Sequence, residues 1–151
     1  MELPTIKLNT SGTMKRKQLL LGLLALLIVG ASVGYYFFQK KTPDASAYRT
    51  DAKLSAMELF TAFELNENTA NQQFLGKTLE VQGEIKSIDN KADSPTATVY
   101  LDGGGLLGGI ACEMAKDKLS DDLAPGQSIL IKGICSGLLM DVVLNRCVIV
   151  N

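Results

Sequence analysis

The chain has 151 residues, about the length of one domain, and 46% of them are apolar, 21% are charged and the formal net charge is -1. It contains three Cys but no His and no Trp, which excludes Ser-His-Asp and Cys-His catalysis and leaves thiolates, carboxylates and backbone carbonyls as the main metal ligands. The near-neutral charge argues against a protein that grips nucleic acid over a wide face, because such a protein needs a strongly basic surface to neutralise phosphates.

Residues 19–38 form an uncharged apolar stretch near the N-terminus. They comprise sixteen apolar residues, three Gly and one Ser. Twenty helical residues extend about 30 Å, which matches the hydrocarbon thickness of a bilayer. The stretch ends in four consecutive aromatic residues, Tyr35 to Phe38, and aromatic rings favour the membrane interface. The sequence therefore predicts a single membrane-spanning helix at 19–38.

A cleaved secretory signal peptide is the main alternative for this stretch, because residues 19–29 are followed by small residues at 30–32. The aromatic block that comes next favours an uncleaved anchor. No Cys lies just beyond the stretch, so attachment as a bacterial lipoprotein through an N-terminal Cys is not available.

The orientation of the helix is predicted from its basic flanks. Four cationic residues lie on each side within a similar distance, at positions 7, 15, 16 and 17 and at positions 40, 41, 49 and 53. The N-terminal group is the tighter cluster, and cationic flanks stay in the cytoplasm. We therefore expect a short basic cytoplasmic tail at 1–18 and a C-terminal domain outside the cytoplasm, in the periplasm.

Residues 39–54 contain Pro, Ser, Ala and alternating charges without apolar periodicity, which is typical of a juxtamembrane linker. Beyond residue 38 the chain has eleven Lys and Arg against fifteen Asp and Glu, a net charge of -4. The small charge of the whole chain thus averages a basic tail and an acidic domain. An acidic domain is repelled by phosphate backbones and by anionic lipid.

The folded domain, 55–151, begins with a predicted amphipathic helix. Ser55 and Glu58 form a capping-box pattern, and Leu54, Met57, Phe60 and Phe63 recur at three-residue spacing on one face. The pattern breaks at residues 66–71, and a second short turn containing Phe74 ends at Gly76, a C-cap candidate. We expect this face to pack on its own domain; a partner-binding helix is the alternative.

Five strands are predicted after the helix. In 78–87 the inward row is Leu79, Val81, Gly83 and Ile85, and Gly83 within that row suggests a bulge or a tight bend. The second strand, 96–101, turns Val99 and Leu101 inward. The remaining strands are predicted at 106–112, 128–135 and 139–150, with a short helix at 114–123 and a turn around Gly137. Three strands, a helix and two strands are the layout of an OB-fold, a mainly β five-stranded Greek-key barrel.

One glycine motif competes with this interpretation. Gly103, Gly105 and Gly108 spell G-x-G-x-x-G after a strand, which is how a dinucleotide-binding turn begins. Only one such unit fits, and the next strand ends in Cys135 instead of an acidic residue for a ribose hydroxyl. We therefore predict a Gly-rich hairpin. The sequence contains no P-loop pattern.

From about Ser55 to Asn151 the chain resembles the tRNA_anti-like family of OB-fold domains. The resemblance rests on the sequences GKTLEVQGEI at 76–85, PGQ at 125–127, IKGICSG at 131–137 and MDVVL at 140–144, together with Asn66, Ala70, Cys112 and Cys147. It covers the domain but not the tail. It implies an OB-fold, which many bacterial members carry behind a membrane anchor or a lipoprotein signal, and it does not imply a ligand.

The family name suggests anticodon binding, which requires a basic groove with aromatic platforms for stacked bases. From Thr78 onward the chain has one aromatic residue, Tyr100, and its cations are scattered. Tyr100 alternates outward and is the one ligand-binding candidate; a cross-strand packing role is the alternative. We therefore expect nucleic acid not to be the partner.

The three Cys lack a C-x-x-C pattern and a His, so no metal site is predicted. The third and fifth strands of an OB-fold run parallel as neighbours, so Cys112 and Cys147 are candidates for a disulfide outside the cytoplasm, with Cys135 unpaired. Three buried free thiols are the alternative.

No catalytic residues are predicted. Asp121 and Asp122 are adjacent and point different ways, while Glu80, Glu84 and Asp141 lie on strands whose outward faces are charged. We therefore expect a single-pass, membrane-anchored OB-fold module of the cell envelope, without enzymatic activity or cofactor, that binds a protein, a peptide or a glycan. The alternatives are a nucleic-acid-binding OB-fold domain facing the cytoplasm and a mainly structural envelope component.

Overall fold

The computed structural model describes residues 11–39, 43–105 and 108–150, and within the first range the side chains of 17–36. The chain divides into two compact units, Met1–Thr42 and Pro43–Asn151. The first contains the helix α1 (Ser11–Gln39). Within it, Lys17–Tyr36 has a mean hydropathy of 2.1 and is long and apolar enough to cross a membrane. The predicted apolar helix is thus confirmed.

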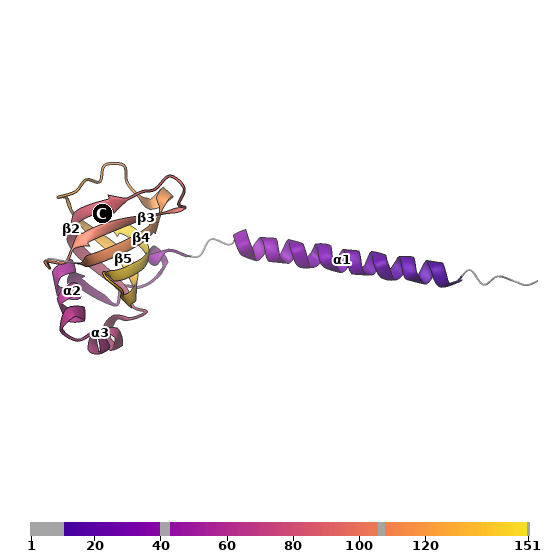
Figure 1. Ribbon diagram of the computed structural model, residues 1–151, viewed down its shortest axis with the longest axis horizontal. Helices are drawn as coiled ribbons and strands as arrows, with labels where there is room; N and C mark the ends of the chain where they lie inside the picture. Colours follow the sequence, from indigo (N-terminus) through magenta and orange to yellow (C-terminus); the bar gives the residue numbers. More distant parts are fainter. Residues whose placement is uncertain (1–10, 40–42, 106–107, 151) are drawn as a thin grey trace, which may run out of the picture. The chain divides into compact units, whose positions relative to one another are not determined.

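The second unit is a β-barrel with two helices (Figure 1). Its elements are η1 (Ala45–Ala47), β1 (Ala52–Ser55), α2 (Ala56–Leu65), α3 (Glu67–Phe74), β2 (Thr78–Asp89), β3 (Thr96–Asp102), β4 (Gly109–Ala115), η2 (Lys116–Lys118), β5 (Ser128–Leu138) and β6 (Val142–Val150). The strands are ordered β1-β2-β3-β4-β6-β5, and β5 pairs back to β2. That last pairing closes β2 to β6 into the predicted five-stranded OB-fold barrel.

The long first barrel strand allows the closure. Residues 78–84 of β2 pair with β5, and from Ile85 onward β2 pairs with β3 instead. A register shift between Ile85 and Ser87 marks a bulge where the strand bends toward its second partner. The bulge therefore lies at Lys86, three residues beyond the predicted position at Gly83. The β4 and β6 strands pair in parallel, as predicted.

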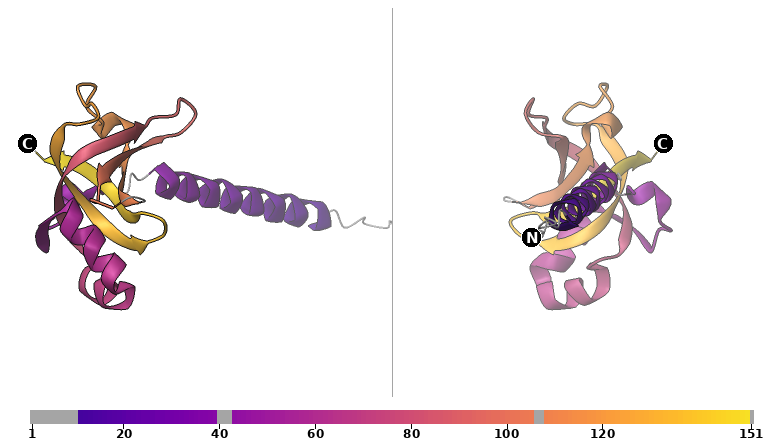
Figure 2. Two further views of the ribbon diagram at one scale, coloured as in Figure 1. Left: turned by 60° about the vertical axis from the view of Figure 1, so that its left-hand side comes forward. Right: turned by 90° about the vertical axis from the view of Figure 1, so that its right-hand side faces the viewer.

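Gly83 has a different role from the predicted bend. A Cβ atom at this position would lie 2.8 Å from Ala56 Cβ and 3.2 Å from Leu101 Cβ. Real Cβ atoms do not approach that closely, so the missing side chain lets the start of α2 lie directly on the barrel. Figure 2 shows α2 lying across one end of the barrel, where it contacts four of the barrel strands.

The capping box at Ser55 is confirmed: the Glu58 N–H donates to Ser55 Oγ at 3.2 Å, and the Ser55 N–H donates to Glu58 Oε2 at 2.7 Å. The buried face of α2 is Ala56, Leu59, Phe60 and Phe63. Met57, predicted to be inward, is 60% exposed, because a three-residue spacing drifts away from one face of a 3.6-residue helical turn.

Strand alternation supplies the rest of the core. Val99 and Leu101 point inward, as predicted, and are fully buried. The β4 strand is Gly109–Ala115, so the predicted strand, 106–112, was wrong at both ends. Gly108 precedes the strand, and residues 106 and 107 lie outside the described residues. Met114 is buried in the same inward row as Cys112. The helix predicted at 114–123 is therefore only the single turn η2.

Part of the stretch interpreted as a linker, 39–54, packs on the barrel. The β1 strand pairs in parallel with β2 from Ala52↔Leu79 to Ser55↔Gln82. Glu80 on β2, expected to be solvated, is buried and binds Lys53 on β1 at 2.7 Å. Thr50 Oγ1 also donates to Glu80 Oε1 at 2.5 Å. These polar contacts fasten the segment that follows α1 to the barrel.

Candidate ligand-binding site

Tyr100 lies on the outward face of β3. Its neighbours Val99 and Leu101 fill the core, so the two-residue period of the strand turns Tyr100 away from the core. Strand register places it beside Ser87 on β2 and Ala111 on β4. The ring is half-buried. The predicted outward orientation is therefore confirmed.

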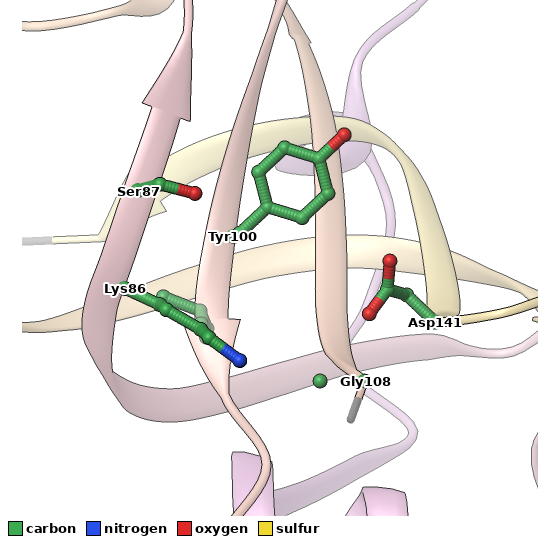
Figure 3. A pocket seen from close by; sticks show the side chains of 7 residues that line it. Lys86, Ser87, Tyr100, Gly108 and Asp141 are labelled. Atoms are coloured by element: carbon green, nitrogen blue, oxygen red, sulfur yellow. The ribbon is translucent and has the colours of Figure 1, made fainter. Parts of the chain in front are cut away.

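The Tyr100 ring lies in a pocket with a volume of 190 Å³. The pocket is lined by Lys86, Ser87, Tyr100, Leu101, Gly108, Gly109 and Asp141. Figure 3 shows Lys86 and Ser87 on one side of the ring and Asp141 on the other. Lys86 is the bulged residue of β2, and a bulge re-aims a side chain. Asp141 comes from the β5–β6 turn, so the pocket is formed by residues far apart in the chain.

Two glycines shape the pocket at the start of β4. A Cβ atom on Gly108 would lie 2.7 Å from the Phe60 ring, and one on Gly109 would lie 2.3 Å from the Leu101 carbonyl oxygen. Gly108 also has a φ of +95°, in the left-handed region that favours glycine. These glycines lie where β3 connects to its antiparallel neighbour β4, so the connection leads into a strand and not into a helix. The Gly-rich hairpin is thus confirmed, and the dinucleotide-binding alternative is wrong.

The polar groups around Tyr100 have spare hydrogen-bonding capacity. Within the described residues, neither Lys86 nor Asp141 forms an ion pair, and the Tyr100 hydroxyl forms no hydrogen bond. An ammonium group offers donors, a carboxylate offers acceptors and a phenol offers both. The pocket can therefore hold a ligand that has donors, acceptors and an apolar surface for the ring.

An apolar rim adjoins the pocket. Leu139 and Met140, in the turn before Asp141, are 85% and 87% exposed, and the Met140 carbonyl oxygen is 3.1 Å from the Cβ position of Gly108. We call Leu139 and Met140 the apolar rim. The rim was not predicted from the sequence, because the last strand was expected to span 139–150, whereas β6 begins at Val142. Three consecutive large apolar residues between Gly137 and Asp141, more than one strand face can bury, could have indicated an exposed turn.

Several cations of the domain already have partners. Lys91 binds Asp89 at 3.1 Å, and Lys118 binds Asp44 at 3.3 Å. Lys116 donates to the Lys91 carbonyl oxygen, and Lys132 donates to the Tyr48 carbonyl oxygen at 2.6 Å. These contacts attach loops to the barrel. The described cations therefore do not form a continuous basic groove beside Tyr100.

The other candidate groups do not join this pocket. In the described part of the chain, no group of three or more Cys, Asp and Glu could hold a metal ion. Cys112, Cys135 and Cys147 are free cysteines and are buried in β4, β5 and β6. The disulfide between Cys112 and Cys147 stays a prediction. The bond from Lys53 and a second from Thr50 lower the pKa of Glu80, which suits a structural ion pair.

The fold and the sequence were compared with known proteins. A family model, tRNA_anti-like, matches residues 14–149 and thus includes α1 as well as the barrel. A solved structure provisionally described as a nucleic acid-binding lipoprotein from Klebsiella pneumoniae subsp. pneumoniae MGH 78578 is similar in fold, with 18% identity and a TM-score of 0.55 over 74% of this chain and 100% of that one.

A structure provisionally described as an aspartyl-tRNA synthetase from Leishmania major Friedlin has 13% identity and a TM-score of 0.44 over 75% of this chain and 22% of that one. None of the curated proteins compared with the chain matches it. The likeness to the Klebsiella structure, at 18% identity, supports the fold alone and implies no ligand.

Proposed function

The chain belongs to the tRNA_anti-like family, and on that premise we propose that it is a membrane-anchored OB-fold binding module of the cell envelope, without enzymatic activity. The observation that carries the proposal is the pocket at Tyr100, where an aromatic ring lies between an ammonium and a carboxylate that form no ion pair with other described residues. OB-folds bind ligands on the face of their second and third strands and at the loop between the fourth and fifth. In this chain these are β3, β4 and the β5–β6 turn.

Three observations support the membrane anchor. The 20-residue segment Lys17–Tyr36 is unburied and apolar, and a basic cluster precedes it. The family match begins at residue 14, so it includes this segment. The similar Klebsiella structure is described as a lipoprotein. We propose that α1 is the anchor, and that the barrel faces the periplasm because the tighter basic cluster is N-terminal.

The proposed ligand is a protein, a peptide or a glycan. Lys86 and Asp141 carry opposite charges on the two sides of Tyr100, which suits a ligand with both donors and acceptors. The apolar rim beside them suits contact with a protein or peptide, since exposed Met side chains adapt to varied apolar partners. A volume of 190 Å³ accommodates one side chain or one sugar ring rather than a larger ligand.

Nucleic acid is the second candidate, because the Klebsiella structure is provisionally described as nucleic acid-binding. Single-strand binding needs stacking platforms along a basic groove. Tyr100 is the one aromatic residue from Thr78 onward, and the domain carries more acidic than basic residues. The electrostatics of this chain therefore favour the first candidate.

The location can be tested by cysteine labelling in intact cells. The three native cysteines are buried, so Asp93→Cys, in the exposed β2–β3 loop, introduces the one accessible thiol among the described residues. A membrane-impermeant maleimide should label this variant before lysis. Labelling only after lysis would place the domain in the cytoplasm and favour nucleic acid.

The ligand class can be tested on the full chain in detergent micelles. Soluble peptidoglycan glycan strands, a library of short peptides and a single-stranded oligonucleotide are compared by equilibrium binding. Tyr100→Ala should weaken binding of a glycan or peptide at least tenfold, whereas Tyr48→Ala, which removes a partly exposed ring outside the pocket, should not. Salt-sensitive micromolar binding of the oligonucleotide that depends on Tyr100 would contradict the proposal.

A further inference from the structure

Two of the three buried thiols face the core from strands that pair in parallel. The β4–β6 ladder runs from Ile110↔Val142 to Cys112↔Leu144 and ends there. Cys147 lies three residues beyond Leu144, the last residue of β6 that pairs with β4, and is also buried. A covalent link between Cys112 and Cys147 would therefore close the barrel where the backbone ladder stops.

A bulge in β6 turns Cys147 inward. On β5, Lys132 pairs with Val148 and Ile134 with Asn145, so Arg146 and Cys147 together oppose the single residue between Lys132 and Ile134. Arg146 has a φ of 56° and is the one described non-glycine residue with positive φ. Strict alternation after Leu144 would bury Arg146 and expose Cys147. The left-handed backbone at Arg146 instead exposes Arg146 and buries Cys147. Such a conformation costs free energy in a non-glycine residue, and the placement of Cys147 in the core explains why it is kept.

The space for the Cys147 side chain is provided by Gly133 on β5. A Cβ atom on Gly133 would lie 2.6 Å from Cys147 Sγ and 3.0 Å from Leu144 Cβ. The Cys147 S–H donates to the Leu144 carbonyl oxygen at 3.2 Å, and Leu144 is the register partner of Cys112. Burial, together with the adjacent Cys112 thiol, raises the pKa of Cys147 well above its ordinary value.

We propose that Cys112 and Cys147 form a disulfide that joins β4 to β6 as the chain folds outside the cytoplasm. The inference rests on the envelope location proposed above, because thiols in the cytoplasm stay reduced. Cys135, on β5, remains a free thiol. The disulfide is a covalent closure of the barrel at a site distinct from the Tyr100 pocket.

The oxidant is a dithiol oxidoreductase in its disulfide form. One thiolate of this chain attacks a sulfur of that disulfide and forms a mixed disulfide; the second thiolate then attacks the sulfur of the first and releases the oxidoreductase as a dithiol. The two thiols of the chain lose two protons and two electrons, and the oxidoreductase gains both. Because the thiolate is the reactive form and burial disfavours it, the exchange precedes closure of the barrel.

The pairing is tested on the purified full chain, unfolded, reduced and refolded in detergent micelles with glutathione disulfide as oxidant. The intact mass should fall by two hydrogen atoms. Digestion should yield a peptide that links Cys112 to Cys147, with Cys135 open to alkylation after unfolding. Cys135→Ser should retain the link, and Cys147→Ser should lose it. Three alkylatable thiols in the refolded chain, or a link through Cys135, would overturn the pairing.

A second measurement separates the pairing from the location. Cells that produce the Cys135→Ser variant are quenched in acid, and thiols are then alkylated under denaturing conditions. We expect no alkylated thiol in this variant. If the pair forms in vitro but both thiols are alkylated from cells, the envelope location fails and the pairing stands. If both measurements find free thiols while the impermeant maleimide labels Asp93→Cys, the pairing fails and the location stands.

Discussion

Replacement of Gly133 by Ala tests the register of β5 against the bulged β6 strand. The added Cβ atom would lie 2.6 Å from Cys147 Sγ and 3.0 Å from Leu144 Cβ, both buried. Overpacking of this kind costs about 1–3 kcal/mol of unfolding free energy. Cys147→Ala removes the nearer obstacle. By itself it costs about 1 kcal/mol, the scale of one buried methylene group.

The double variant, Gly133→Ala with Cys147→Ala, should therefore lose about 1 kcal/mol of unfolding free energy, much less than the sum of the two single losses. Urea denaturation of the full chain in detergent, with reductant present, gives the free energies from the midpoints and slopes. Gly76→Ala is the matched control: Gly76 has a φ of +75° and no atom within 4 Å of its Cβ position, so its strain should be independent of Cys147.

If the losses of unfolding free energy at Gly133 and Cys147 added up in the double variant to within about 0.5 kcal/mol, the contact between these two residues would be refuted. A neutral Gly133→Ala variant would do the same. Either result would mean that Cys147 does not face Gly133, and the argument for the bulge at Arg146 would fail with it.

Three further predictions concern the stability of the domain. Ser55→Ala breaks the capping box of α2 and should lower the unfolding free energy by about 1 kcal/mol in urea. Phe63→Ala removes a buried ring beside Phe74 and should cost about 3–5 kcal/mol, seen as a large drop in Tm. The Ser55 N–H lowers the pKa of Glu58, and the bond from Lys53 lowers that of Glu80. The stability that these carboxylates contribute should thus be present above their ordinary pKa of 4.5 and be lost as the pH falls through the lowered pKa values. Urea midpoints measured down to acid pH will check this. The Glu80→Gln variant should lose less stability over the same pH range.

The barrel was predictable because its strands alternate apolar and polar residues, as at Leu79, Val81 and Ile85. The β1 strand was not, because its alternation of Ala52 and Leu54 with polar residues is only four residues long. The strand is held by pairing with β2 and by the Lys53–Glu80 ion pair. Glu80 is buried on a face that alternation assigns to solvent, because Lys53 and Thr50 of the neighbouring segment bind its carboxylate.

The candidate site was predictable only in part. The outward orientation of Tyr100 follows from alternation along β3. A bulge brings Lys86 beside Tyr100, and closure of the barrel brings Asp141 there. No sequence pattern predicts either the bulge or the contact between residues so far apart in the chain. The same holds for Cys147, since the left-handed residue that turns it inward is an Arg and not a Gly.

The central claim, that the Tyr100 pocket binds a protein, peptide or glycan outside the cytoplasm, is tested most directly by photocrosslinking in living cells. A photoreactive phenylalanine analogue replaces Tyr100 in the full chain, and the same analogue at Tyr48 is the control. Crosslinked adducts are expected at position 100 only. Nuclease should leave them intact, and either glycan hydrolase should shorten them or mass spectrometry should find a second polypeptide in them. Adducts that nuclease degrades, or equal adducts at both positions, would contradict it.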